Sequence, residues 1–178
     1  MIADRPGQRG FTLVEILVVM LIIGIVAGGA LLSLGVLGQD RQLETERQRL
    51  ETLLQLVRDR AAIHSEQYGL RAFTGGYEFM VYDSRLSRWQ VVAEDDRVLR
   101  RRTLPAGLQL TLVVEGRPVV LPKPDAKDAA PQVLLYSSGE LNVFELTVLR
   151  EGGADGFRAA PASQDDSIVF TVLPQVLQ

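Results

Sequence analysis

The 178-residue chain contains no cysteine and only one histidine, His64. Without cysteine no disulfide can form, so the folded part must be stabilised by packing alone. With one histidine, neither a histidine-based metal cluster nor a Ser–His dyad with a spare partner is apparent, and we expect His64 to be a surface or packing residue. The glycine-rich segment 152–156 lacks the regular acidic spacing of a calcium loop, and no phosphate-binding glycine motif is present. These absences argue against an enzyme and leave no catalytic residue, metal or cofactor to predict.

Charge is also missing from one long stretch, because no charged residue occurs between Ile16 and Gly38. About twenty apolar residues suffice to cross a bilayer. Glu15 heads this stretch, and a carboxylate at the edge of hydrocarbon is costly unless it is paired, so Glu15 is a candidate functional residue. A short leader with Arg5 and Arg9 precedes it. Basic residues favour the cytoplasmic side, so we expect a cytoplasmic N-terminus and a C-terminal part on the other side of the membrane.

The junction between the leader and the apolar stretch reads Gly10-Phe11-Thr12-Leu13-Val14-Glu15. This pattern resembles the class III signal of type IV pilin-like proteins. The resemblance implies that a membrane-embedded prepilin peptidase cuts after Gly10 and methylates the new N-terminal residue, Phe11. It also implies that Glu15 recognises a neighbouring subunit during fibre assembly. Inside a helical bundle, a carboxylate from one subunit and an ammonium from another would remove each other's desolvation penalty.

Two plainer interpretations of the same segment remain open. A secretory signal peptide also has a basic start and an apolar stretch, and the small residues 27–30 could supply a cleavage site. The apolar stretch continues past them to Leu37, however, and Glu15 is unusual inside a signal peptide. An ordinary single-span anchor explains the length of the stretch but not the Gly-Phe-Thr-Leu-x-Glu junction.

We expect the helix to continue after the apolar stretch, because residues 40–66 contain no proline and no glycine. Charged residues such as Glu44 and Glu46 mostly fall away from an apolar stripe at helical spacing. That stripe consists of Leu43, Leu50, Leu53, Leu54, Val57, Ala61 and Ile63. Its thickening after Leu50 indicates that the second half lies against a sheet. The expected division is a leader (1–10), a transmembrane and assembly helix (11–38), an amphipathic continuation (39–66) and a periplasmic β domain (67–178).

From Leu70 onward the apolar period changes from that of a helix to that of a strand. Turn residues separate the candidate strands, beginning with Gly75-Gly76, which suits a tight hairpin. The expected strands are 70–74, 77–82, 89–93, 98–104, 108–114, 119–121, 133–136, 141–149 and 168–173. Residues 122–131 and 151–166 are expected to be loops. A long helix followed by an antiparallel β domain is an α+β fold.

A second resemblance lies at Leu134-Leu135-Tyr136-Ser137-Ser138-Gly139-Glu140 and the apolar strand from Val143 to Val148. A strand, a Ser-Ser-Gly-Glu turn and a second strand are similar to the H-type minor pseudopilin of type II secretion. The same turn is also generic hairpin chemistry without a binding role. The resemblance implies a long N-terminal helix packed on two β-sheets. The lack of cysteine agrees with it, because fibre-forming type IV pilins usually carry a C-terminal disulfide loop.

The implied role is that of a structural subunit, held in the inner membrane and then incorporated into a periplasmic pseudopilus that it helps to initiate or cap. Such a fibre moves folded exoproteins through an outer-membrane pore. The expected partners are the major pseudopilin, the other minor pseudopilins, the prepilin peptidase and the inner-membrane assembly platform. The secreted exoproteins are a further candidate.

The arginine cluster Arg97–Arg102 supports an alternative, a minor type IV pilin involved in pilus assembly or in DNA binding and uptake. Its four arginines could neutralise phosphates. Against this, no aromatic residue alternates with them and acidic residues 94–96 precede them. The whole chain, with 19 basic and 22 acidic residues, also has no general nucleic-acid footprint. A charged edge strand, protected against unwanted pairing, would explain the same cluster.

Overall fold

The computed structural model describes residues 13–92, 96–126, 130–162 and 167–173, without the side chains of residues 27–40. The chain forms two compact units, residues 1–41 and 42–178. Helix α1 (Leu13–His64) has residues in both units. The second unit adds two antiparallel β-sheets, so the expected α+β class is confirmed.

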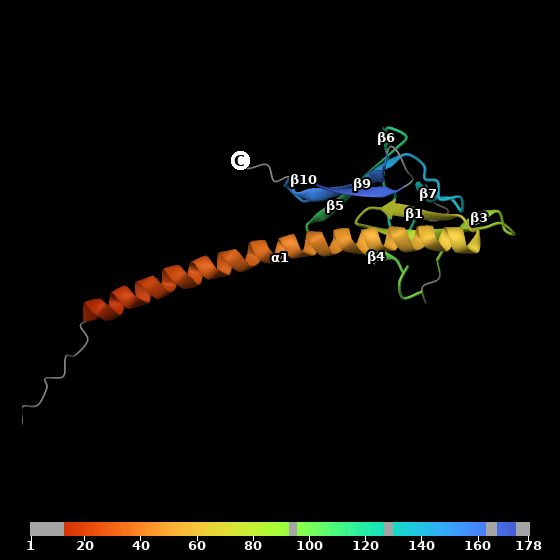
Figure 1. Ribbon diagram of the computed structural model, residues 1–178. Helices are drawn as coiled ribbons and strands as arrows, with labels where there is room; N and C mark the ends of the chain where they lie inside the picture. Colours follow the sequence, from red (N-terminus) through yellow and green to blue (C-terminus); the bar gives the residue numbers. More distant parts are fainter. Residues whose placement is uncertain (1–12, 93–95, 127–129, 163–166, 174–178) are drawn as a thin grey trace, which may run out of the picture. The chain divides into compact units, whose positions relative to one another are not determined.

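Each sheet has five strands, and all neighbouring strands are antiparallel (Figure 1). The first sheet consists of β1 (Tyr68–Phe73), β2 (Gly76–Asp83), β3 (Arg88–Val91), β4 (Arg102–Thr103) and β7 (Val133–Leu135). Its order is β3-β2-β1-β7, with β4 also paired to β2. The second sheet consists of β5 (Leu108–Val114), β6 (Arg117–Pro118), β8 (Phe144–Arg150), β9 (Gly156–Pro161) and β10 (Ile168–Leu173). Its order is β10-β9-β8-β5-β6.

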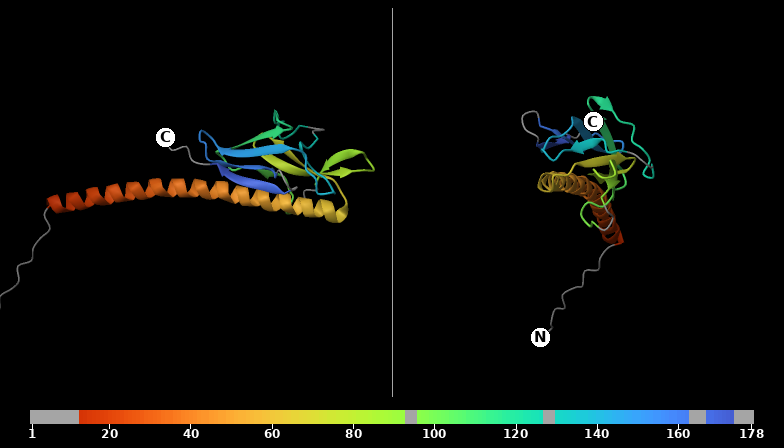
Figure 2. Two further views of the ribbon diagram at one scale, coloured as in Figure 1. Left: turned by 45° about the horizontal axis from the view of Figure 1, so that its top comes forward. Right: turned by 90° about the vertical axis from the view of Figure 1, so that its right-hand side faces the viewer.

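The C-terminal half of α1 packs along the strands (Figure 2). Leu50, Leu54 and Val57 are buried in one core that also contains side chains from both sheets. The apolar stripe expected from the sequence is therefore the face that lies on the sheets. Ile63 is an exception, because it is 75% exposed. It follows the buried Ala61 by two residues, which places it on the opposite side of the helix.

The first hairpin turns one residue earlier than the sequence suggests. Phe73 pairs with Gly76, so the two turn residues are Thr74 and Gly75 rather than Gly75 and Gly76. Gly75 has a φ of 82°, which favours glycine. Gly76 belongs to the strand, where a Cβ atom would collide with the backbone carbonyl of Arg102. The two glycines thus serve different purposes, one conformational and one steric.

Two of the expected strands are wrong in their position. Residues 97–99 form a turn instead of the start of a strand, because Asp96 Oδ1 accepts the N–H groups of Val98 and Leu99 at 2.9 and 3.0 Å. Such local hydrogen bonds compete with a β ladder. Residues 119–121 are not a strand either, and the short strand β6 precedes them.

The expected loop 151–166 contains a strand, β9, which lies between β8 and β10. Its sequence has one glycine, two alanines and a proline, which are poor strand formers on propensity alone. Small side chains are needed here because the neighbours crowd the strand. A Cβ atom at Gly156 would collide with the carbonyl of Val148, and Ala159 is fully buried.

Candidate functional site

Of the three residues that the junction motif predicts as functional, the structure describes one. Gly10 and Phe11 lie outside the described residues. Glu15 lies in the first turn of α1, and its side chain is exposed. The positive end of the helix dipole favours a carboxylate at this place. The position allows Glu15 to meet a cation from another chain, and this role stays a prediction.

The side chains around Glu15 form an apolar surface on every side of the helix. All of residues 13–26 are exposed, and 12 of these 14 are large hydrophobic side chains. Soluble monomers rarely expose a continuous apolar patch of this extent, and a helix that is apolar all round is normally buried. Among the described residues, no helical segment is both long and apolar enough for a membrane crossing. Residues 13–26 need further apolar surface, from outside the described chain, to cover them.

A buried carboxylate fixes the position of α1 on the first sheet. Glu46 is 1% exposed. The hydroxyl of Tyr77, on β2, donates to Glu46 Oε1 at 2.8 Å, and Arg49 Nη1 donates to Oε2 at 2.5 Å. Burial, followed by the charge of Glu46, raises the pKa of Tyr77 above its usual range, so the hydroxyl keeps its proton and remains a donor. The pairing from two sides compensates the buried charge and sets the axial position of the helix.

Sequence reasoning missed Glu46, which it grouped with the solvated charges of the helix. The feature that could have identified Glu46 was its position on the same helical face as the apolar stripe. Glu46 precedes Leu50, Leu53 and Val57 by four, seven and eleven residues, so all four lie on one face. A carboxylate in phase with a buried stripe indicates a polar partner on the element opposite.

A second buried charge pair joins β1 and β2, where Arg71 is opposite Glu78. Both side chains are buried, and they form an ion pair. Arg71 Nη1 also donates to the carbonyl of Ala126 at 3.0 Å. Arg101 Nε lies 3.7 Å from Glu78 Oε2, and its guanidinium lies 4.4 Å from the ring centre of Phe73. These contacts attach the loop that follows β6 to the first hairpin.

The structure divides the arginine cluster 97–102 into two groups. Arg101 and Arg102 each donate to a backbone carbonyl of the same chain, at 2.5 and 2.9 Å. Arg97 and Arg100 are exposed on and after a turn. The expected charged strand 98–104 is reduced to β4 (Arg102–Thr103), and two of the four guanidinium groups are used to hold loops. This arrangement weakens the DNA-binding alternative, which needs several arginines available for phosphates.

The turn Ser137–Glu140 connects β7 with β8, as the second resemblance implies. Gly139 has a φ of 92°, which favours glycine. Ser138 Oγ donates to Glu140 Oε2 at 3.3 Å. The side chain of Asn142 then makes two hydrogen bonds to the backbone beside β7. These interactions lie within the chain, so they account for the conformation of a turn that links the first sheet to the second.

The remaining candidates from the sequence offer no arrangement for chemistry. His64 is exposed at the last residue of α1. Within the described ranges, no group of three or more His, Asp or Glu side chains could hold a metal ion. Gly152 takes a φ of 73° in the turn before β9. We assign this segment a conformational role only.

Two protein families match the chain. The prokaryotic N-terminal methylation motif matches residues 5–31, which contain the whole junction from Gly10 to Glu15. The family described as type II transport protein GspH matches residues 46–167. The second match covers more than half of the chain and includes α1 from Glu46 onward with nine of the ten described strands.

Individual proteins give the same result. The chain is 39% identical over 165 residues to the type II secretion system protein H of Pseudomonas aeruginosa, covering 89% of this chain and 92% of that protein. It is 32% identical over 154 residues to the type II secretion system protein H of Aeromonas hydrophila, covering 83% of this chain and 84% of that protein.

Solved structures agree in fold. The crystal structure of the minor pseudopilin EpsH from the Vibrio cholerae type II secretion system is similar, with a TM-score of 0.63 at 20% identity, covering 76% of this chain and 96% of that chain. The solution structure of Escherichia coli GspH has a TM-score of 0.58 at 19% identity, covering 79% and 94%. At these identities the structures establish the architecture alone.

Proposed function

The chain belongs to the type II transport protein GspH family and is a minor pseudopilin of type II secretion, and from this premise we propose how it works. It is a single-pass protein of the inner membrane, with a cytoplasmic N-terminus and a periplasmic β domain. Prepilin peptidase removes residues 1–10 and methylates Phe11. The processed subunit then enters the pseudopilus, together with the major and the other minor pseudopilins, and helps to initiate or cap the fibre.

The observation that carries this proposal is the apolar surface of residues 13–26 with Glu15 in the first turn. Lipid tails and apolar side chains are similar environments, so the same surface suits a membrane first and a bundle of helices later. Within such a bundle only Glu15 discriminates between positions. Its charge is compensated where an ammonium from a neighbour lies beside it, and is costly elsewhere.

The rest of the molecule has a structural role in this proposal. The C-terminal half of α1 is fixed to the sheets by Leu50, Val57 and the Glu46–Tyr77 hydrogen bond. An axial displacement of this half of the helix therefore carries the β domain with it. Neither the family match nor the arrangement of the arginine cluster 97–102 favours the alternative of a minor type IV pilin in pilus assembly or DNA uptake.

The test replaces Glu15 with leucine in cells that make the complete secretion system. Glu15→Leu leaves the partner's ammonium unpaired, which costs roughly 3 kcal/mol or more. This corresponds to a loss of about a hundred-fold or more in cross-linking to the other pseudopilins. Glu44→Leu is the matched control, because it removes an exposed carboxylate of α1 outside the apolar surface.

Both variants should remain in the membrane fraction. Mass spectrometry should show that residues 1–10 have been removed from both, so that a failure of processing cannot explain a failure of assembly. Undiminished cross-linking of Glu15→Leu would contradict the pairing role. Equal losses for Glu15→Leu and Glu44→Leu would contradict it as well, since the effect would then belong to any carboxylate of the helix.

A further inference from the structure

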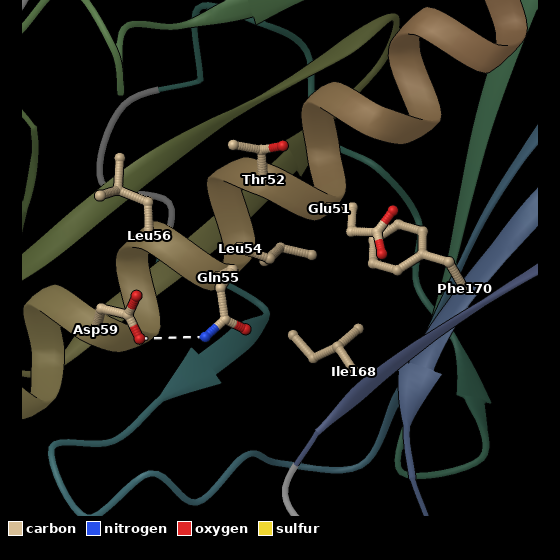
Figure 3. A pocket seen from close by; sticks show the side chains of 8 residues that line it. All are labelled: Glu51, Thr52, Leu54, Gln55, Leu56, Asp59, Ile168 and Phe170. Atoms are coloured by element: carbon tan, nitrogen blue, oxygen red, sulfur yellow. Dashed lines mark hydrogen bonds between the residues drawn. The ribbon is translucent and has the colours of Figure 1, made fainter.

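A groove of about 550 Å³ lies between the C-terminal half of α1 and β10 (Figure 3). Its apolar side includes Leu54 of the helix, with Ile168 and Phe170 of the strand. Figure 3 shows both β10 side chains pointing toward α1. Its polar side includes the acidic residues Glu51 and Asp59. The groove therefore combines an apolar floor with an acidic rim.

The strand beside the groove has an open edge. β10 pairs with β9 alone, and no backbone hydrogen bond between described residues reaches its other edge. Its six residues, Ile168–Leu173, contain no charge and no proline. Val169 and Val172 are exposed. An uncharged edge of this length is a template on which another strand can pair.

The other strands at the edges of the sheets have protections against pairing with a foreign strand, and β10 lacks them. β4 and β6 have only two residues each, and β6 includes Pro118. β3 has four residues and carries Arg88. The far side of β7 is occupied by the bridge from Leu135 to Leu141 and by Asn142. Shortness, proline, charge and cover are the usual protections of sheet edges, and β10 has none of the first three.

We propose that the outer edge of β10 and the groove beside it form a docking site for an extended segment of another secretion-system protein. The segment adds a sixth strand to the second sheet through backbone hydrogen bonds, and alternate side chains enter the groove. The identity of the partner as a secretion-system protein rests on the proposed function. The site itself rests on the strand edge and the groove.

The charges of the rim define the chemistry of the occupant. Glu51 is paired with Arg47 at 2.8 Å, whereas the partner of Asp59 among the described residues is the neutral amide of Gln55, which donates to it at 3.1 Å. Pairing of β10 with β10 of a second copy would place two acidic grooves next to each other, and like charges oppose this arrangement. A segment with a lysine or arginine beside Asp59 is complementary instead. We therefore assign the site to a different protein with a basic side chain.

The absence of cysteine from the chain makes a direct test possible. Val172→Cys places a single thiol on the edge strand, where the native valine is 64% exposed. Val143→Cys places one outside this strand, where the native valine is 61% exposed, so the two sites are matched in exposure. The full-length variants are labelled with a small maleimide in cells that make all secretion proteins and in cells that make only this chain. We expect the Val172→Cys thiol to react about ten-fold more slowly when the other proteins are present, and the Val143→Cys thiol to react equally in both. Equal rates for Val172→Cys in both strains would overturn the proposal.

Two further results decide the nature of the occupant. Disulfide-linked dimers of Val172→Cys on a non-reducing gel, in cells that make only this chain, would assign the edge to a second copy and overturn the proposal. Adding Asp59→Lys to Val172→Cys should restore the fast labelling rate. If the thiol of that double variant remains protected from labelling, the assignment of a basic side chain to the occupant is refuted.

A functional comparison separates this inference from the proposed function. In a deletion strain, Val172→Lys should restore secretion of an extracellular hydrolase at least ten-fold less well than Val143→Lys. Full rescue by Val172→Lys would defeat the docking site and leave the proposed function intact. Normal secretion by the deletion strain without any complementing gene would defeat the proposed function itself.

Discussion

The hydrogen bond between Tyr77 and the buried Glu46 allows a sharp prediction, because it can be removed with almost no change of shape. Tyr77→Phe deletes one oxygen and keeps the ring, which lies edge-on to Phe79 at 6.1 Å. Glu46 then keeps Arg49 as its side-chain partner, and that residue is itself 38% exposed. A hydrogen bond to a charged group contributes roughly 1.5–3 kcal/mol, and a buried acceptor left with fewer partners adds to the loss. We expect the free energy of unfolding to fall by about 2–3 kcal/mol.

The assay is urea unfolding of the full-length protein in detergent, followed by the fluorescence of Trp89. This is the single tryptophan of the chain and lies on β3, so its signal reports the β domain. Tyr136→Phe is the control, because it makes the same chemical change at a half-buried tyrosine, and it should alter the free energy by less than about 0.5 kcal/mol.

A double-mutant cycle separates the hydrogen bond from simple loss of packing. Glu46→Leu alone leaves the hydroxyl of Tyr77 buried without its acceptor. Glu46→Leu combined with Tyr77→Phe removes both the carboxylate and the hydroxyl, so no partner is missing from this hydrogen bond. The double variant should therefore be about 1–2 kcal/mol more stable than the sum of the single losses predicts. A loss below about 0.5 kcal/mol for Tyr77→Phe, or strict additivity in the cycle, would refute the reasoning.

Two further predictions concern the β domain. Gly156→Ala should destabilise it by about 2 kcal/mol or more, because the new Cβ collides with the carbonyl of Val148, whereas Gly153→Ala meets nothing closer than 3.7 Å and should be nearly neutral in the same urea assay. The hydrogen bond from Arg60 lowers the pKa of Asp96 to about 2. The ionised Asp96 carboxylate therefore stabilises the fold fully above the unfolded-state pKa of about 4, and this stabilisation is lost as the pH falls through about 2. When urea unfolding is repeated from about pH 5 down to about pH 2, the difference in the free energy of unfolding between the wild type and Asp96→Asn should shrink. A difference that is constant across this range would contradict the assignment.

The features that local sequence determines were predictable. The position of Glu15 at the head of an apolar helix follows from a six-residue motif and an uncharged stretch. The strands 108–114 and 168–173 were predicted with the observed bounds, because both are rich in β-branched and other apolar residues. The Leu50–Ala61 stripe followed from helical periodicity, and it is the face that packs on the sheets.

The features that depend on distant neighbours were not predictable. β9 needs glycine and alanine because of the strands beside it, and these residues read as a loop in isolation. The partner of Glu46 is 31 residues away in the sequence, so only its helical phase was visible. The Asp96 turn replaced the start of an expected strand because one carboxylate satisfied two backbone N–H groups. The groove beside β10 joins elements more than 100 residues apart, and no local pattern indicates it.

The central claim is that this chain is a working subunit of type II secretion. The most direct measurement is the distribution of an extracellular hydrolase between periplasm and medium, in a strain from which the gene has been deleted and in the same strain complemented with it. We predict that the enzyme accumulates in the periplasm of the deletion strain, and that the wild-type gene restores its release. Normal release of the enzyme by the deletion strain would contradict the account.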